Sequence, residues 1–189
     1  MSDTVKQEDW TKPAAMAIPK GGFFDKVEQG RYGPIFPKTP ACYGFSVIAK
    51  VKPGWEEHLY KNAKVMEKAV ADDPTVLGIL KAHYLRWVIF TIKGDKYLMY
   101  QGIFDTDFDK YVDDAIELFN RTGITTVFVN LEGWPPDWKT NLQSVIEFFR
   151  NNQRPSFLEY GEYPYVTADE VKKALRVKSA LSTMLDQMQ

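Results

Sequence analysis

Residues 83–104, HYLRWVIFTIKGDKYLMYQGIF, contain the clearest secondary-structure signal in the chain. Two runs rich in aromatic and β-branched residues flank Lys93-Gly94-Asp95, and a glycine in so short a connection is typical of a β-hairpin. Both faces of each predicted strand are apolar: Leu85, Trp87 and Ile89 against Tyr84, Val88 and Phe90, then Leu98, Tyr100 and Phe104 against Tyr97, Met99 and Ile103. A sheet with one solvent-facing side alternates apolar with polar residues. We therefore expect something to cover both faces of this hairpin.

The segments around the hairpin predict an α+β domain with the element order βαββαβ. A strand is expected at 43–51, and Pro53-Gly54 separates it from a helix that ends before Asp73-Pro74. Strands at 76–92 and 96–104 follow, then a helix at 106–121 that begins with Thr106 and Asp109 as a capping box. A fourth strand is expected at 124–131. This order predicts a ferredoxin-like, four-stranded antiparallel sheet with both helices on one face.

Two segments flank the predicted domain at 43–132. Residues 1–42 are rich in proline and glycine yet contain several aromatic residues, which indicates an ordered arm; a disordered tail is the alternative. Residues 133–189 are expected to form a helical extension packed on the same domain. Its first helix is expected to begin at Pro136-Asp137, and its last begins at the capping box Thr167 to Glu170.

Composition and charge narrow the class of protein. Hydrophobic residues make up 44% of the 189 residues, which is enough for a sizeable core. A net charge of −1 provides no general attraction to nucleic acid or to anionic membranes, and no apolar run approaches the ~20 residues of a membrane span. The N-terminus lacks the apolar segment of a secretory signal, and the single cysteine, Cys42, excludes an internal disulfide. We therefore expect a cytoplasmic protein.

Several motifs in the chain resemble those of a known family. Pro53-Gly54-Trp55-Glu56-Glu57, which follows a predicted strand, resembles the dimeric α+β barrel superfamily. A group of bacterial proteins with H-x-x-R-[WF], Y-x-D-D and Y-P-x-x-T-A motifs is similar at residues 83–87, 111–114 and 163–168. The resemblance implies a homodimer in which two ferredoxin-like units enclose a cavity. Its members include monooxygenases, haem-degrading oxygenases, peroxidases and isomerases, so the fold alone does not identify a reaction.

Two residues in the hairpin are candidate catalytic groups. Arg86 lies among apolar neighbours, where a charge must be paired or face a polar cavity. It is expected either to orient an anionic group of a substrate or to form an ion pair with Asp105, Asp113 or Asp114. His83 lies at the start of the same strand and is suited to acid–base chemistry near neutral pH; a histidine hydrogen-bonded within the fold is the alternative. The walls of the binding pocket are expected to include Tyr84, Trp87, Tyr100 and Phe128.

The sequence contains few candidate metal ligands. Two histidines without a paired spacing and one cysteine do not make a zinc site. Residues 105–116 begin like a calcium loop, but Lys110 replaces the required glycine and Ile116 the final glutamate. No metal site is therefore expected, and no cofactor is required. Haem is compatible with the resemblance, and His83 is then its axial ligand.

These observations favour a homodimer with a pocket for a small aromatic, apolar or lipid-like molecule. If the protein is an enzyme, the resemblance implies an oxidoreductase similar to the monooxygenases or peroxidases of the superfamily. The alternative is a non-catalytic accessory subunit of a larger assembly, in which the aromatic faces are contact surfaces. Neither nucleic acid nor a membrane span is expected in either case.

Overall fold

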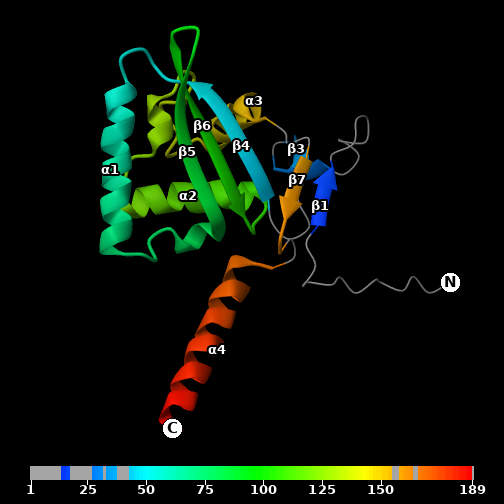
Figure 1. The fold of residues 1–189 in the computed structure, drawn as a ribbon. Helices are drawn as coiled ribbons and strands as arrows, with labels where there is room; N and C mark the ends of the chain where they lie inside the picture. Colours follow the sequence, from blue (N-terminus) through cyan, green and yellow to red (C-terminus); the bar gives the residue numbers. More distant parts are fainter. Residues whose placement is uncertain are drawn as a thin grey trace, which may run out of the picture.

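The structure, a computed structural model, describes residues 14–17, 27–31, 33–37, 43–154, 158–163 and 166–188, and it is of the α+β class. Its main sheet contains β4 (Tyr43–Lys50), β6 (Asp95–Phe104) and β5 (Ala82–Ile92), which are antiparallel neighbours in that order. Helix α1 (Glu56–Asp72) joins β4 to β5, and α2 (Phe108–Thr122) follows β6 (Figure 1). The predicted order strand, helix, strand, strand, helix is therefore confirmed for this part of the chain.

The hairpin between β5 and β6 is tighter than expected. Ile92 pairs with Asp95, so the connection consists of Lys93 and Gly94 alone. Their φ angles are 51° and 90°. Two consecutive residues with positive φ form a type I′ turn, whose twist matches that of the flanking strands. Asp95 therefore belongs to β6 and not to the loop.

The helix ends explain how the chain changes direction. Helix α1 stops at Asp73, immediately before Pro74, as predicted. Helix α2 begins at Asp107 and not at Thr106: the Asp107 carboxylate accepts a 2.8 Å hydrogen bond from the amide of Lys110. Aspartate caps helices at least as well as threonine, so the expected capping box is not used. Gly123 ends α2 with a φ of 69°, the left-handed conformation that glycine favours at a helix end.

The fourth strand expected at 124–131 is not formed, and the described main sheet has three strands. Residues Val127–Asn130 form the short helix η2. The Thr126 hydroxyl accepts a hydrogen bond from the amide of Phe128, and the Asn130 side chain donates to the carbonyl of Val127 at 2.8 Å. Such local side-chain bonds give the backbone an alternative to strand pairing.

The place expected for that strand, at the β4 edge, is occupied by two short segments. Leu131 forms a bridge with Val51, and Gln153 forms a bridge with Val47. The amide of Arg154 also donates to the carbonyl of Ser46 at 2.8 Å. The edge of β4 is thus partly hydrogen-bonded without a continuous fourth strand.

The core lies between one face of the sheet and the helices behind it. Figure 1 shows α2 and α3 (Leu142–Asn152) behind the strands, whereas α1 stands beside the β5 edge. Helix α3 was expected to begin at Pro136-Asp137, but it begins later, with Asn141 as its N-cap. The sheet contributes a buried row on its helix-covered face: Phe45, Val47 and Ala49 from β4, and Leu98, Tyr100 and Phe104 from β6.

Within the described part of the chain, no element covers the second face of the main sheet. Tyr84 is 64% exposed and Ile103 is 42% exposed. Arg86 is also exposed on this face. We call this the open sheet face; it is formed by Tyr84, Arg86, Val88 and Phe90 of β5 and Tyr97, Met99, Gln101 and Ile103 of β6.

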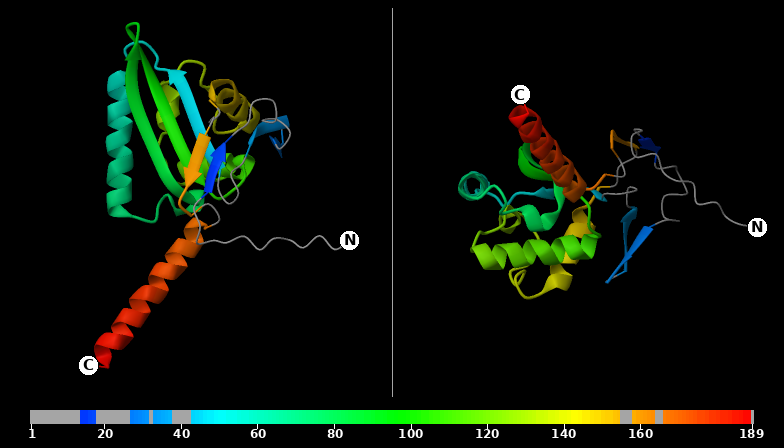
Figure 2. Two further views of the ribbon diagram at one scale, coloured as in Figure 1. Left: turned by 45° about the vertical axis from the view of Figure 1, so that its right-hand side comes forward. Right: turned by 90° about the horizontal axis from the view of Figure 1, so that it is seen from below.

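The terminal segments form two further small sheets beyond the β4 edge (Figures 1 and 2). Strand β1 (Ala14–Ala17) pairs with β7 (Leu158–Gly161), and β2 (Val27–Gly30) pairs with β3 (Gly33–Pro37). Arg31, between β2 and β3, forms a 2.9 Å ion pair with Asp113 of α2. The rest of the predicted arm at 1–42 lies outside the described residues.

The last helix, α4 (Ala168–Gln187), begins with the predicted capping box of Thr167 and Glu170. It does not pack on the domain as α3 does: Ala168 is its only buried residue, and the helix projects away from the sheet (Figure 2). None of the helices in the described ranges has both the length and the apolar character needed to cross a bilayer.

Candidate functional site

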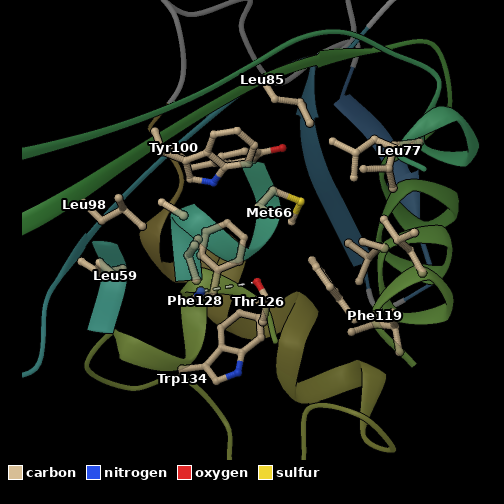
Figure 3. Close-up of a pocket in the computed structure, with 18 of the residues that line it drawn as sticks. Leu59, Met66, Leu77, Leu85, Leu98, Tyr100, Phe119, Thr126, Phe128 and Trp134 are labelled. Atoms are coloured by element: carbon tan, nitrogen blue, oxygen red, sulfur yellow. Dashed lines mark hydrogen bonds between the residues drawn. The ribbon is translucent and has the colours of Figure 1, made fainter. Parts of the chain in front are cut away.

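A cavity of about 570 Å³ lies between α1, the helix-covered face of the sheet and α2 (Figure 3). Its walls are almost entirely apolar. They include Leu59, Ala63, Met66 and Val70 of α1; Leu85, Trp87 and Ile89 of β5; Leu98 and Tyr100 of β6; Tyr111, Ala115 and Phe119 of α2; and Leu77, Thr126, Phe128, Trp134 and Phe149. The cavity is thus enclosed within one chain, on the opposite side of the sheet from the open face.

The position of α1 explains why this space is not filled. The apolar stripe of α1 repeats at the spacing of one helix face, but only Leu59 is buried. A second contact comes from the Asn62 side chain, which donates to the carbonyl of Thr126 at 3.3 Å. Farther along α1, Met66 and Val70 face the cavity and do not pack against the strands. A helix held mainly at one end thereby leaves a space between its other end and β5.

Three of the predicted pocket residues meet in this cavity. The rings of Trp87 and Tyr100 have centroids 5.4 Å apart, and those of Tyr100 and Phe128 are 5.3 Å apart at an angle of 88°. The second pair is edge-to-face, which is a favourable aromatic arrangement. Together the three side chains form one continuous aromatic wall. Trp87 is still 40% exposed, which places it where the cavity opens to solvent.

Few polar atoms reach the cavity. The hydroxyl groups of Tyr100 and Tyr111 are hydrogen-bonded to each other in the buried interior. The Thr126 hydroxyl accepts a 3.4 Å hydrogen bond from the amide of Phe128 and points into the cavity in Figure 3. Because a hydroxyl also has one proton to donate, Thr126 retains a donor without an acceptor among the described residues. It can therefore donate to an acceptor on a ligand.

The tyrosine pair is uncharged over the physiological pH range. Burial raises the pKa of Tyr111 to about 12 and raises the pKa of Tyr100 well above its usual value. The low-dielectric surroundings disfavour the phenolate form of both residues. The pair therefore supplies a neutral hydroxyl group and no general base near neutral pH.

We expect the free energy of unfolding to fall between pH 10 and about 12. The unfolded chain releases the Tyr111 proton near pH 10, whereas the folded protein retains it up to about pH 12. Stability is therefore complete below pH 10 and declines by up to ~1.4 kcal/mol per pH unit for each such tyrosine. Urea unfolding at several pH values should show a shallower decline in Tyr111→Phe. An unchanged slope in that variant would contradict the assignment.

Tyr84 and Arg86 do not face the cavity. Successive side chains of a strand point to opposite sides of the sheet, and Leu85 and Trp87 point into the cavity. Tyr84 and Arg86 alternate with these two residues along β5, and they therefore lie on the open sheet face. None of the predicted partners of Arg86 pairs with it: Asp113 pairs with Arg31, and Asp114 pairs with Lys110. Among the described residues Arg86 has no ion-pair partner.

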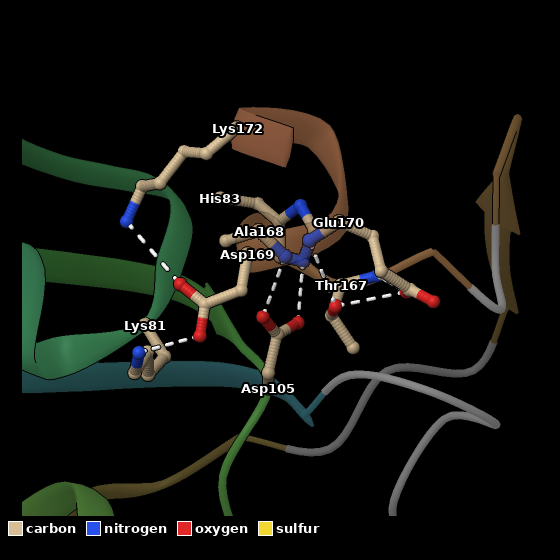
Figure 4. Close-up of polar contacts among 8 residues, drawn as sticks. All are labelled: Lys81, His83, Asp105, Thr167, Ala168, Asp169, Glu170 and Lys172. Carbon is tan, nitrogen blue, oxygen red and sulfur yellow. Dashed lines mark hydrogen bonds and ion pairs between the residues drawn. The ribbon is translucent and has the colours of Figure 1, made fainter. Parts of the chain in front are cut away.

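His83 is also outside the cavity. The register of β5 and β6 shifts between Ala82 and Tyr84, so His83 occupies a β-bulge and leaves the alternation on which its predicted orientation depended. Its Nε2 atom lies 2.5 Å from Oδ1 of Asp105, whose Oδ2 accepts a 2.7 Å hydrogen bond from the amide of Ala168 (Figure 4). His83 thus helps to attach α4 to the end of the sheet. It does not line the cavity, so it does not fit the role of axial ligand for a haem bound there.

The prediction from sequence omitted several residues of the cavity. Tyr111 and Ala115 belong to a helix that was expected to lie on one face of the sheet, and Thr126 was assigned to a strand. One available signal is the spacing of Leu59, Met66 and Val70, which all line the cavity from α1. A stripe of this kind predicts burial but does not distinguish a packed core from a cavity wall.

In the described residues, no group of three or more histidine, cysteine, aspartate or glutamate side chains is arranged to hold a metal ion. The geometry instead assembles an apolar chamber with two kinds of neutral hydroxyl group. Comparisons with protein-family models, with curated proteins and with solved structures found no match to this chain, so the resemblance to the dimeric α+β barrel superfamily stays a prediction.

Proposed function

We propose that this protein binds a neutral, largely apolar small molecule in the cavity between α1 and the sheet. The observation that carries this proposal is a space of about 570 Å³ with almost entirely apolar walls. Pockets for small ligands typically measure ~300–1,000 Å³ and combine apolar walls with a few polar groups. An aromatic or lipid-like ligand agrees with the walls formed by Trp87, Tyr100 and Phe128.

The charge of the lining specifies the ligand further. Glu67 is the only charged residue among those that line the cavity, and it is exposed on α1. An ionised group inside would have no opposite charge, and burying an unpaired charge is strongly unfavourable. The Thr126 hydroxyl favours a ligand with one hydrogen-bond acceptor, such as a carbonyl, ether or alcohol oxygen. The anionic ligand expected from Arg86 is not favoured by this lining.

Binding is better supported than catalysis. His83 and Arg86, the two predicted catalytic residues, lie outside the cavity, and the buried tyrosines retain their protons at neutral pH. An oxidoreductase activity therefore gains no support from the placement of these residues. The proposal is a binding or carrier function for the ligand.

Fluorescence titration with N-phenyl-1-naphthylamine, a neutral apolar probe, tests this proposal. We expect saturable binding that Ala115→Phe weakens by roughly 10-fold or more, because a ring at this position occupies the cavity and displaces the probe. Ala71→Phe, on the exposed side of α1, adds the same ring outside the cavity and should leave binding unchanged. Equal affinity in the wild type and Ala115→Phe would contradict the proposal.

Competition at pH 8 tests the charge of the ligand separately. Dodecanol and dodecanoate have the same chain length, but only dodecanoate is ionised at that pH. We expect dodecanol to displace the probe and dodecanoate to compete at least ~10-fold less well, because the carboxylate would be buried without a partner. Stronger competition by dodecanoate would indicate an anion site and would contradict the neutral lining argued above.

A second candidate function, that of an accessory subunit, is favoured by one observation. The described chain leaves two largely apolar surfaces uncovered. One is the open sheet face, and the other is the row of exposed apolar side chains along α4, from Val171 to Met188. Exposed surfaces of this kind often mark protein–protein contacts.

A further inference from the structure

The direction of α4 is set at its first turn. The carboxylate of Asp105 accepts a hydrogen bond from the amide of Ala168 at 2.7 Å, and Lys81 forms a 2.5 Å ion pair with Asp169 (Figure 4). The Lys81 ammonium group also lowers the pKa of Asp169, which favours the charged form of the carboxylate. These contacts join the start of α4 to the residue before β5, Lys81, and to the residue after β6, Asp105. Beyond this turn, the residues from Val171 to Met188 are all exposed.

One half of the α4 surface is apolar and has no partner among the described residues. At ~100° per residue, the large apolar side chains occupy about half of the helix circumference, an arc that also contains Lys178, and polar residues such as Lys172, Arg176 and Thr183 occupy the other half. Seven large apolar side chains are between 42% and 76% exposed: Val171, Leu175, Val177, Leu181, Met184, Leu185 and Met188. Most helices in proteins depend on packing of such a face for their stability.

The helix extends on the same side as the open sheet face. The view from below in Figure 2 shows α2 on one side of the sheet and α4 extending to the other. The two uncovered surfaces, α4 and the open sheet face, therefore adjoin the same region of space. A single partner placed there contacts both of them.

We propose that this partner is a second copy of the chain, and that the two copies exchange their α4 helices so that each apolar half lies on the open sheet face of the other. In a two-fold dimer this contact occurs twice, and both surfaces are covered by one arrangement. Seven residues of this size and exposure carry roughly 700 Å² of surface. If about half of it is buried against an equal area of sheet, and this contact occurs twice, the total reaches the ~1,200–2,000 Å² of stable interfaces.

Each of the two surfaces carries a charge that the other can neutralise. Arg86 lies on the open sheet face, in the edge strand β5, without an ion-pair partner among the described residues. Asp186 lies at the margin of the apolar half of α4, beside Leu185, and no described residue pairs with it either. Placing Asp186 of one copy beside Arg86 of the other neutralises both charges. This contact gives the unpaired arginine of a largely apolar face a specific role.

A membrane surface fits α4 less well than a second copy does. Helices that lie on membranes typically combine an apolar face that contains aromatic residues with a strongly basic polar face. Residues 168–187 contain no aromatic residue, and their four basic residues against three acidic residues leave a net charge of only +1. Dimerisation through α4 accounts for both the helix and the sheet face.

Sedimentation equilibrium of the full chain tests the interface. We expect a dimer, and we expect Leu181→Asp in the centre of the apolar half to raise the dimer dissociation constant by about 100-fold or more. Thr183→Asp places the same charge near the centre of the polar half of α4 and should leave the dissociation constant within about 3-fold of wild type. A monomeric wild-type protein, or a dimer that is insensitive to Leu181→Asp, would overturn the proposal.

Charge exchange distinguishes helix exchange from other dimers. We expect Arg86→Glu and Asp186→Arg each to weaken the dimer by about 10-fold, and the double variant to recover most of the loss because it restores opposite charges. Additive losses in the double variant would show that the two residues do not meet. Flotation with vesicles that contain anionic lipid tests the membrane alternative. The proposal would be overturned if the wild-type protein stayed monomeric and bound these vesicles, and if Leu181→Asp abolished that binding. This result would assign α4 to a membrane surface.

Discussion

Phe104→Ala is expected to lower the free energy of unfolding by about 3–5 kcal/mol, the usual cost of removing a buried aromatic side chain. Phe104 is 0% exposed, and its ring stacks on Tyr111 with centroids 3.9 Å apart and an angle of 12°. It also lies 6.3 Å from the ring of Phe45. Removal of Phe104 therefore opens a space at the contact of β4, β6 and α2, where the sheet and helices share one core. Urea unfolding monitored by circular dichroism measures the change.

Two further variants make the Phe104 prediction specific. Phe104→Leu keeps most of the apolar volume and should cost less than half as much as the alanine variant. Tyr160→Ala removes an aromatic side chain that is 65% exposed, and it should change the free energy of unfolding by less than ~0.5 kcal/mol. A similar loss in Phe104→Ala and Tyr160→Ala would mean that the aromatic contacts described above do not hold the sheet to α2.

Gly102→Ala is expected to destabilise the protein by about 2–4 kcal/mol, through overpacking and loss of a buried hydrogen bond. A Cβ atom at this position would lie 2.8 Å from the hydroxyl oxygen of Tyr100 and 3.3 Å from Cδ2 of Leu85. The first distance is too short, so the Tyr100 ring must move. That movement separates its hydroxyl from that of Tyr111 and displaces a wall of the cavity. We therefore expect weaker probe binding together with the loss of stability.

Gly78→Ala is the matched control for this substitution. Gly78 lies in the short helix η1 (Gly78–Leu80), and a Cβ atom added there meets no atom within 4 Å. Alanine at this position should leave the free energy of unfolding within ~0.5 kcal/mol of wild type, or slightly raise it by reducing the entropy of the unfolded chain. Equal effects of the two substitutions would show that the cost at Gly102 comes from the backbone and not from Tyr100.

Glycine, proline and capping residues in the sequence correctly predicted where several turns and helices begin or end. Gly94 adopts a positive φ in the β5–β6 turn, Pro74 follows the end of α1, and the Thr167 capping box starts α4. In each case a short-range steric or hydrogen-bonding effect selects the conformation, and the same residue types are visible in the sequence. The fourth strand was predicted at 124–131. Instead, the Thr126 hydroxyl accepts a hydrogen bond from the amide of Phe128 and the Asn130 side chain donates one to the carbonyl of Val127, and both bonds favour a short helix there.

The candidate site was predicted in part, and the errors have a geometric origin. Trp87 and Arg86 are adjacent in one strand, so they cannot both face one cavity, and assigning both to it contradicted the alternation of the sheet. His83 was assigned by the same alternation, which a β-bulge interrupts at that residue. Trp87, Tyr100 and Phe128 do meet in the cavity. Their meeting depends on the three-dimensional position of η2, which no residue pattern specifies.

The position of α1 also has a consequence for self-association. β5 is the last strand in the order β4-β6-β5, and its 11 residues are long and apolar for an edge strand. Unpaired backbone groups along such an edge can template pairing with another chain, and natural proteins usually shield them. Helix α1 stands beside this edge (Figure 1), and it also forms one wall of the cavity. A ligand in the space between α1 and β5 would contact both elements and hold α1 near this edge. An occupied cavity should therefore protect the protein against aggregation as well as against unfolding.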